Sequence, residues 1–192
     1  MGTTSLVILA VIVIAALYGI GIYNRLVNLK HGVSKAWSNI DVLLKQRHDE
    51  LPKLISTCKE YMRHESQTLQ SVIEARSQVS KAREGGDVGA LGAAEGMLRM
   101  GLGKLFALAE NYPDLKANES FQHLETRITG LENTIADRRE FYNESVNINN
   151  IGIEEFPDVI VARMFNFKAA TLLEFATEEK ADVNLGKLFG QQ

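Results

Sequence analysis

Histidine and glutamate side chains are the residues of this chain whose spacing could hold a metal ion. Glu60 with His64, and Glu119 with His123, each place a carboxylate and an imidazole four residues apart, on one face of a helix. A di-iron bundle needs Glu-x-x-His on two helices and lone Glu residues on two others, and this chain only approaches that pattern. We therefore favour two solvent-facing polar pairs over a metal site, and we predict no cofactor.

Common catalytic and nucleotide-binding motifs are absent from the sequence. The single cysteine, Cys58, excludes zinc sites built from paired thiolates, and His64-Glu65 lacks the second histidine of a zinc-protease helix. The sequence contains no Gly-x-Ser-x-Gly elbow, phosphate-binding loop or dinucleotide fingerprint. A net charge of -3 provides no basic field for nucleic acid. We therefore predict that the protein is not an enzyme and does not bind nucleic acid.

The segment from Asn111 to Asn118 is rich in side chains that hydrogen-bond the backbone of turns, and it includes Tyr112, Pro113 and Asp114. We interpret it as a structural turn in which Pro113 ends one helix, Asp114 bonds the turn and Asn118 caps the next helix. A site for a ligand or a partner is the alternative interpretation of the same turn.

Helices must position these residues, because apolar side chains recur at alternating spacings of three and four from Leu26 onward and no strand alternation appears. The pattern predicts helices over residues 33–84, 88–110, 119–149 and 158–177, with a kink or a local break near residues 48–51 before Pro52. We expect Gly152 and Pro157 to separate the last two helices. The predicted fold is all-α, an antiparallel bundle of long helices.

Glycines are frequent between residues 85 and 103. Gly85-Gly86 is predicted to end the first helix, whereas the glycines from 89 to 103 fall inside the second. Each of these costs about 1 kcal/mol relative to Ala in a helix. They indicate either a loosely held segment or the close approach of another helix.

The beginning of the chain differs in composition from the rest. Residues 1–24 contain no charged side chain, so all 21 Lys and Arg and all 24 Asp and Glu lie beyond Asn24. The apolar run from Leu6 to Ile22, extended to residues 3–23, makes a helix of roughly 31 Å, which matches a hydrocarbon core of about 30 Å. The start, Met-Gly-Thr-Thr-Ser, lacks the positive charge of a signal peptide, and no clear cleavage site follows. We predict a retained transmembrane helix that continues into the bundle.

The predicted domains are a transmembrane anchor over residues 1–24, a helical-bundle domain over 25–177 and a partly ordered tail over 178–192. Arg25, Lys30 and Lys35 follow the apolar run, so the positive-inside rule places the body in the cytoplasm and the short N-terminus outside. The expected location is the inner (cytoplasmic) membrane, crossed once. A periplasmic or extracellular body is the alternative.

Aromatic residues gather in the C-terminal quarter, which holds Phe156, Phe165, Phe167, Phe175 and Phe189. Most of these rings are expected to fill the core of the bundle. The alternative is an aromatic surface for contact between subunits or with the membrane interface.

Five blocks occur in order along the chain: Ala36-Trp37-Ser38-Asn39-Ile40-Asp41-Val42, Leu44-Lys45-Gln46-Arg47-His48-Asp49-Glu50-Leu51-Pro52, the 111–118 turn, Phe141-Tyr142-Asn143 and Glu155-Phe156-Pro157. In this order they resemble the LemA family of bacteria, over about residues 1 to 175. The resemblance implies one N-terminal transmembrane helix and a helical-bundle body, and it implies no activity, because the family has no established catalytic function. Lys53 stands where the family commonly has Asn, and the glycines of residues 85–103 replace a helix richer in Ala and Glu.

We expect a structural role for the residues of these blocks. Trp37, Asp41 and Arg47 share one predicted helix, and Asp41 and Arg47 are expected to hydrogen-bond between helices in a buried polar network.

The favoured function is a membrane-anchored, non-catalytic scaffold or interaction protein that self-assembles through its helices and could organise or shape the membrane. The alternative is an accessory subunit of another membrane protein, such as a protease or a transport system, and a metal-binding bundle is less favoured. The expected partners are the lipid bilayer, further copies of the chain and a membrane-protein partner.

Overall fold

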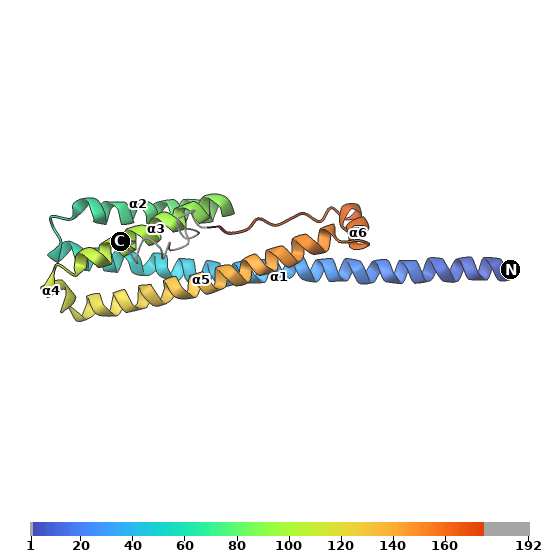
Figure 1. The fold of residues 1–192 in the computed structure, drawn as a ribbon, viewed down its shortest axis with the longest axis horizontal. Helices are drawn as coiled ribbons and strands as arrows, with labels where there is room; N and C mark the ends of the chain where they lie inside the picture. The colour runs from blue at the N-terminus through green and yellow to red at the C-terminus, as the bar shows by residue number, and fades with distance from the viewer. Residues whose placement is uncertain (1, 175–192) are drawn as a thin grey trace, which may run out of the picture. The chain divides into compact units, whose positions relative to one another are not determined.

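The computed structural model describes residues 2–174 and, within this range, contains helices and no strand, which confirms the all-α prediction. Phe175, Phe189 and the predicted tail lie outside the described residues. Figure 1 shows the helices, with α2 and α3 side by side. They are α1 (Thr3–Tyr61), α2 (Ser66–Gly85), α3 (Val88–Ala109), α4 (Pro113–Lys116), α5 (Glu119–Glu154) and α6 (Asp158–Met164).

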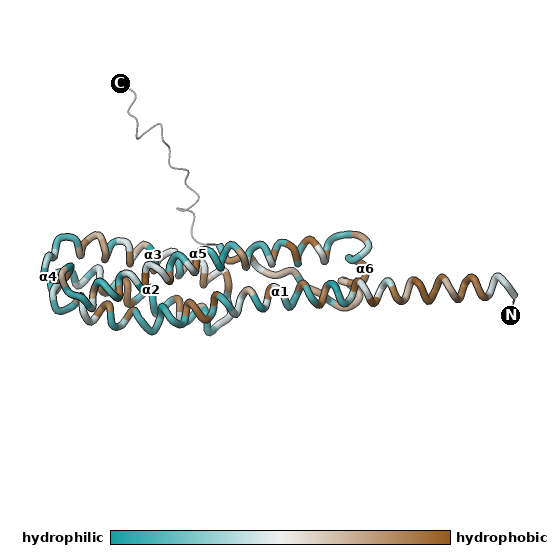
Figure 2. Tube along the Cα trace, turned by 90° about the horizontal axis from the view of Figure 1, so that it is seen from below, coloured by the Kyte–Doolittle hydropathy of each residue, from teal (hydrophilic) through white to brown (hydrophobic). Residues whose placement is uncertain are grey.

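The first part of α1 is apolar and has almost no protein around it. Its large side chains are roughly half to two-thirds exposed, from 59% for Leu6 and 67% for Ile14 to 56% for Ile20. In Figure 2 this part of α1 is coloured as hydrophobic nearly throughout, whereas the other helices alternate in hydropathy. By length and composition, α1 can cross a membrane, as the sequence predicts.

The described chain divides into two compact units. Unit 1 comprises Met1–Val42 with Ala136–Leu172, and so holds the start of α1, the end of α5 and α6. Its core is built from Ile22, Leu26 and Ala162, against which Leu29 and Phe167 pack. Within unit 1, α1 and α5 run antiparallel, because rising residue numbers on α1 meet falling numbers on α5.

Unit 2 comprises Leu43–Ile135 and, from residue 173 onward, the described residues Leu173 and Glu174. It holds the rest of α1, all of α2, α3 and α4, and the start of α5. Its helices bury the apolar stripes that the sequence shows. The fully or nearly fully buried side chains include Ile55, Leu51, Leu54, Leu69, Val72, Leu91, Leu98, Leu105, Leu115 and Phe121.

The long first helix predicted over residues 33–84 is wrong, because α1 ends at Tyr61 and α2 begins at Ser66. The chain turns within the polar step Arg63-His64-Glu65, where the apolar stripe has no member. Met62 stays fully buried and its amide still donates to the carbonyl of Cys58, at 2.8 Å. A turn can therefore replace a helical segment without losing the apolar face on either side.

Of the kink or local break expected near residues 48–51, the break is absent, since α1 passes through Pro52. Proline lacks an amide hydrogen, so the carbonyl of His48 has no helical donor. Arg76 on α2 supplies one instead, because its Nε donates to His48 O at 3.1 Å. A side chain from a neighbouring helix thus satisfies the carbonyl that the proline leaves unpaired.

The C-terminal helix is shorter than predicted, since α6 ends at Met164 and residues 167–174 form no helix. Gly152 does not end α5 either. A Cβ at this position would lie 2.6 Å from Leu29 Cδ1, so the glycine lets α5 approach α1 closely within unit 1. The turn before α6 contains Pro157, as expected, and the Phe156–Pro157 peptide bond is cis.

The glycine-rich α3 combines two situations. A Cβ on Gly101 would lie 3.3 Å from Val72 Cγ2, and one on Gly92 would lie 2.0 Å from the backbone oxygen of Glu174. These two glycines therefore serve close approach, one of the two explanations that the sequence allows. Gly103 has nothing within 4 Å, and Gly86 ends α2 in the left-handed conformation with φ 67°.

Candidate functional site

Three charged side chains meet in the interior of unit 2. Arg47 of α1 donates from Nη2 to Glu95 Oε1 of α3 at 2.5 Å, and from Nη1 to Glu132 Oε1 of α5 at 2.6 Å. The side chains of Arg47 and Glu95 are each 1% exposed, and that of Glu132 is 16% exposed. One arginine therefore joins three helices from inside the bundle.

Electrostatics decides what this cluster can do. Burial opposes the charge of Arg47, but the two carboxylates outweigh it and raise its pKa. Burial raises the pKa of Glu95 in spite of the adjacent guanidinium. Because neither side chain reaches solvent, no substrate can approach them, and we interpret the cluster as a structural network that specifies how the helices pack. Among residues 2–174, Arg47 Nε is the one buried side-chain nitrogen or oxygen atom without a hydrogen-bond partner.

Two further contacts of unit 2 join α1 to its neighbours. Arg76 Nη2 lies 2.7 Å from His48 Nε2, beside the bond that Arg76 makes to the His48 carbonyl. Burial and the charge of Arg76 lower the pKa of His48, which favours the neutral ring as acceptor. Glu50 is bound by Lys53 at 3.0 Å and by Arg127 of α5 at 3.2 Å. The hydrogen bond from Lys53 lowers the pKa of Glu50, and the charge of Arg127 adds to this effect.

The polar turn predicted over residues 111–118 organises one end of unit 2. Asn118 Oδ1 accepts from the amide of Phe121 at 3.1 Å, so it caps α5 as predicted, and its Nδ2 donates to the hydroxyl of Tyr61 at 3.1 Å. Tyr112 donates to Glu65 Oε1 at 3.2 Å. The turn therefore connects the start of α5 to the end of α1 and to the 62–65 turn.

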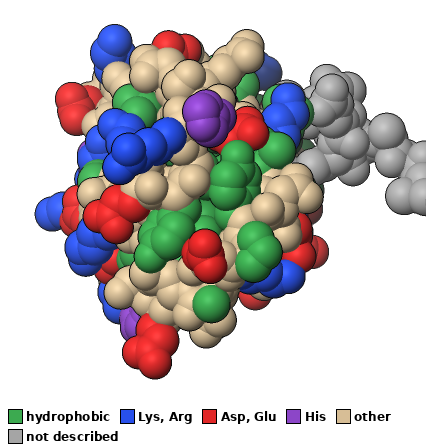
Figure 3. Space-filling view, turned by 90° about the vertical axis from the view of Figure 1, so that its left-hand side faces the viewer, with side chains coloured by type: hydrophobic (Ala, Val, Ile, Leu, Met, Phe, Trp, Pro, Cys, Tyr) green, Lys and Arg blue, Asp and Glu red, His purple; other side chains and the backbone are tan. Residues whose placement is uncertain are grey.

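Pro113 and Asp114 differ from the prediction for this turn. Pro113 starts the one-turn helix α4, because α3 already ends at Ala109. Asp114 lies in the first turn of α4, and Leu115 is fully buried. Asn111 and Asp114 are exposed. Figure 3 looks onto this end of unit 2, where hydrophobic side chains gather in the centre and charged side chains surround them.

In unit 1, aromatic and amide side chains of α5 hold the segment that follows α6. Trp37 of α1 packs on Tyr142, with ring centroids 5.5 Å apart, and the Tyr142 hydroxyl donates to the carbonyl of Thr171 at 2.8 Å. Asn150 accepts from the amide of Ala170 at 2.8 Å and donates to its carbonyl at 3.0 Å. Burial raises the pKa of Tyr142. These contacts fasten an extended segment to a helix through side chains.

The other signature residues occupy different environments. Asp41 and Asn143 are half-buried, Pro52 is exposed on α1, and Phe156 is 77% exposed at the turn before α6. The expectation that the aromatic rings fill the bundle core thus holds for Phe167, which packs on the core of unit 1, and fails for Phe156 and Phe165.

The histidine and glutamate pairs do not gather into a site. His64 lies in the turn after α1, away from the helix that carries Glu60, while Glu119 and His123 are exposed on the first turns of α5. Across residues 2–174, no group of three or more His, Cys, Asp or Glu side chains is placed to hold a metal ion.

Three partners in these networks were not anticipated from the sequence: Glu95, Glu132 and Arg76. The position of Glu95 could have been identified as buried from the sequence, because Glu95 lies in the apolar stripe of α3 between Leu91 and Leu98, at spacings of four and three. A charge at an apolar stripe position indicates a buried ion pair when another helix has an opposite charge at such a position. No sequence pattern identifies Arg76, because its role depends on the His48 carbonyl, which is left unpaired on another helix.

These features define a class of all-α proteins in which a long apolar N-terminal helix continues into a helical bundle joined by buried polar contacts. The model of the LemA family matches residues 36–185, and the chain belongs to the LemA family. This finding confirms the resemblance seen in the five sequence blocks.

Three curated relatives match much of the chain. Magnetosome protein MamQ 1 of Paramagnetospirillum magneticum is 25% identical over 171 residues, covering 77% of this chain and 63% of that protein. Magnetosome protein MamQ of Magnetospirillum gryphiswaldense is 24% identical over 169 residues, covering 76% and 62%. Protein LemA of Metamycoplasma hominis is 26% identical over 171 residues, covering 88% and 76%. The chain thus spans less than two thirds of the length of the magnetosome relatives.

Proposed function

We propose that this chain is a membrane-anchored, non-catalytic scaffold or interaction protein that crosses the inner (cytoplasmic) membrane once. The observation that carries the proposal is the bare apolar part of α1, whose side chains from Leu6 to Ile20 face no protein while the same helix continues into folded units. Water does not solvate such a surface favourably, and a bilayer does. Within one copy of the chain, the described residues do not bury this segment.

A non-catalytic role is supported by what the polar side chains do. In the best-defined charged cluster, Arg47 and Glu95 are buried inside unit 2, Glu132 is mostly buried, and the ion pairs join three helices. Membership of the LemA family and likeness to proteins named as magnetosome proteins support a membrane-associated, non-enzymatic role.

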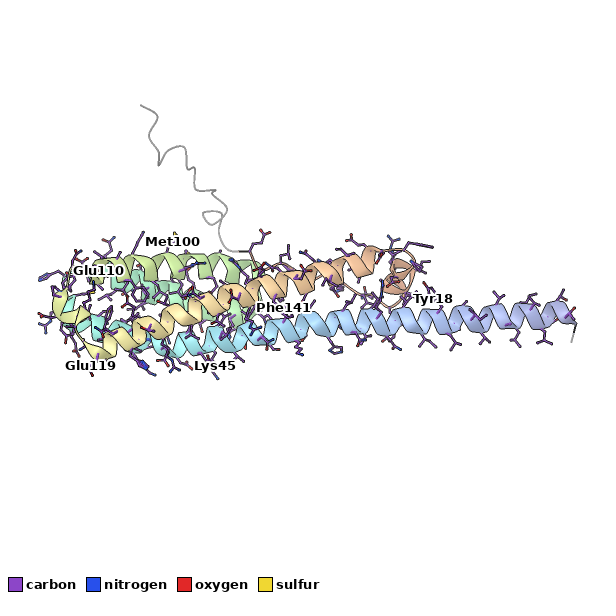
Figure 4. The ribbon with its side chains drawn as sticks, turned by 60° about the horizontal axis from the view of Figure 1, so that its bottom comes forward. Tyr18, Lys45, Met100, Glu110, Glu119 and Phe141 are labelled. Carbon is purple, nitrogen blue, oxygen red and sulfur yellow. The ribbon has the colours of Figure 1, made fainter. Side chains whose placement is uncertain are left out.

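Self-assembly is supported by apolar side chains that remain on the surface of the helices. Met97 and Met100 on α3 are 42% and 45% exposed, and Ile148 and Ile151 on α5 are 46% and 62% exposed. Figure 4 shows Met100 on the outer side of α3. Contact between copies would bury such residues, and an array of anchored copies would organise or shape the membrane.

Crosslinking in native membranes, followed by sizing of the detergent-extracted full chain, tests self-assembly. We expect multimers that weaken when Met97 and Met100 are both replaced by Lys, and that persist in a matched variant with Lys replacing the exposed Thr126. Monomer alone in both measurements would contradict the scaffold. A reproducible second protein in affinity purification would then favour the alternative, an accessory subunit of a protease or transport system.

Orientation is tested by labelling single cysteines from either side of the membrane, in a chain where Cys58 is replaced by Ser. With the body in the cytoplasm, a cysteine at Lys45 should be protected in intact cells and should react after permeabilisation. Reaction in intact cells would place the body in the periplasm or outside the cell.

A further inference from the structure

Four large apolar side chains are exposed in and around α6 of unit 1. Phe156 is 77% exposed, Ile160 54%, Met164 71% and Phe165 55%. Ile160 and Met164 are four residues apart and so share a face of the helix. This density of exposed apolar side chains within ten residues marks a contact surface.

The contacts of α6 fix its level along α1. Arg25 of α1 forms ion pairs with Asp158 and, at 3.5 Å, with Glu155. Tyr23 packs edge-on against Phe165, with ring centroids 4.8 Å apart, and Ala162 lies in the core beside Ile22 and Leu26. The exposed side chains of α6 therefore lie where the uncharged run of α1 ends and its first charged residue stands. In a membrane-spanning helix this is the level of the lipid headgroups, where aromatic rings are preferred.

A cavity of about 620 Å³ opens beside this contact, within unit 1. Its lining includes the cationic side chains of Lys30 and Lys168, with His31, Tyr23 and Phe167, and it contains no acidic residue. Among residues 2–174, neither Lys30 nor Lys168 is engaged in an ion pair. The nearby carboxylates of Glu155 and Asp158 are held by Arg25 instead. The cavity thus offers positive charge next to aromatic surface, which suits a phosphate group attached to a lipid.

We propose that unit 1 carries a site for an anionic phospholipid. The exposed side chains at residues 156–165 enter the leaflet whose surface lies at Tyr23, and the cavity takes the phosphate of a headgroup near Lys30 and Lys168. This proposal rests on the proposed function, because it requires α1 to span the bilayer. It adds that the folded body touches the membrane through a second, non-spanning element.

The depth of α6 is tested with tryptophan as the reporter, in full chain that carries Trp37→Phe and is reconstituted into vesicles of phosphatidylglycerol and phosphatidylcholine with brominated acyl chains. Phe156→Trp and, separately, Met164→Trp should show blue-shifted emission that the bromine quenches. The matched control is Phe141→Trp, because Phe141 is also exposed, at 54%, and belongs to α5 of the same unit (Figure 4). Its neighbour Tyr142 packs on Trp37, about 21 Å further along α1 than Tyr23. This control should show red-shifted emission without quenching.

A tryptophan inside the apolar run, Leu9→Trp, separates the two proposals. If Leu9→Trp is quenched while both α6 variants behave like Phe141→Trp, the lipid site is overturned and the membrane anchor stands. If Leu9→Trp is not quenched either, both proposals are overturned.

The headgroup is tested by native mass spectrometry of the detergent-solubilised full chain with added phosphatidylglycerol, phosphatidylcholine or inorganic phosphate. Each lysine near a lipid surface contributes about fivefold to binding, so Lys30→Gln with Lys168→Gln should weaken phosphatidylglycerol binding at least tenfold. Lys45→Gln with Lys104→Gln, two exposed lysines of unit 2, is the control matched for charge and should leave binding unchanged. Equal loss in both double variants, or equal binding of phosphatidylcholine, would overturn the site. Equal occupancy by inorganic phosphate would show that the cavity binds a free anion, and it would overturn the lipid site.

Discussion

Replacing Arg47 by Met should lower the free energy of unfolding by about 3–5 kcal/mol. The guanidinium is 1% exposed and compensates Glu95, which is also 1% exposed, whereas Glu132 is 16% exposed and keeps some contact with water. Met retains much of the side-chain volume, so the main loss is the uncompensated carboxylate of Glu95 and not a cavity. The same substitution releases α1 from α3 and α5 within unit 2.

The size of this loss should depend on pH. Burial raises the pKa of Glu95, and Arg47→Met removes the charge that opposes this rise. A carboxyl whose pKa is higher in the folded protein takes up a proton on folding. Its contribution to stability is therefore fully present below the unfolded pKa of about 4.3 and is lost as the pH rises through the folded pKa. The deficit of the variant should shrink between pH 8 and pH 5.

Thermal unfolding of the full chain in detergent, followed by circular dichroism, measures this effect. For a chain of this length, 1 kcal/mol corresponds to about 2–4 °C, so the Tm should fall by roughly 6–20 °C. Arg47→Met with Glu95→Met should recover most of the loss, because the buried carboxylate is gone. Arg127→Met removes a half-exposed guanidinium and should lower the Tm by no more than about 4 °C. An unchanged Tm for Arg47→Met, or no recovery in the double variant, would refute this reasoning.

Four further outcomes are expected. Burial and the neighbouring Arg76 lower the pKa of His48 in the folded protein. Stability should therefore be lost as the pH falls below about 6.5, the pKa of an unfolded histidine, and on through the folded pKa. In a curve of Tm against pH, His48→Gln should flatten this part. Burial raises the pKa of the Cys58 thiol to about 12, so a maleimide at neutral pH should label the native chain far more slowly than the unfolded chain, and equal rates would contradict its burial. Gly103→Ala should raise the free energy of unfolding by up to about 1 kcal/mol, because the surroundings of Gly103 are open. Gly92→Ala should lower it, because the backbone oxygen of Glu174 occupies the space that a Cβ needs. Tm changes of the same sign in both variants would count against this packing. Asn118→Ala should cost about 1 kcal/mol through loss of the α5 cap, and Asn118→Ser should retain most of it, as read from the same melts.

Periodicity predicted most of the helices because it reports burial directly. The α3 boundary at Val88 and the cap of α5 at Asn118 were found from local signals alone. The sequence does not predict the turn at residues 62–65, because this turn contains neither glycine nor proline. A short run of polar residues looks the same in a sequence whether the helix continues through it or ends there. The passage of α1 through Pro52 depends on a donor from α2, which no local signal contains.

The structural role of Arg47 was predicted, but its partners were not. Sequence spacing placed Arg47 on a helix whose neighbours Leu44 and Leu51 are buried, which already indicates an inward side chain. Identifying Glu95 and Glu132 requires the register between helices, which depends on the whole set of packed side chains. The level of α6 beside Tyr23 has the same origin, because side-chain contacts between residues 130 and 133 positions apart set it.

The division of unit 1 into two distant pieces of sequence has a consequence for its synthesis. Residues up to Val42 leave the ribosome long before Ala136, and at about 5–20 residues per second the interval is roughly 5–20 s. During this interval the face of Leu26 has no partner, because α6 and the end of α5 have not been made. Unit 1 therefore cannot complete its core until α6 and the end of α5 have been translated, so the apolar side chains of its first piece stay without their native partners during most of the synthesis of the chain.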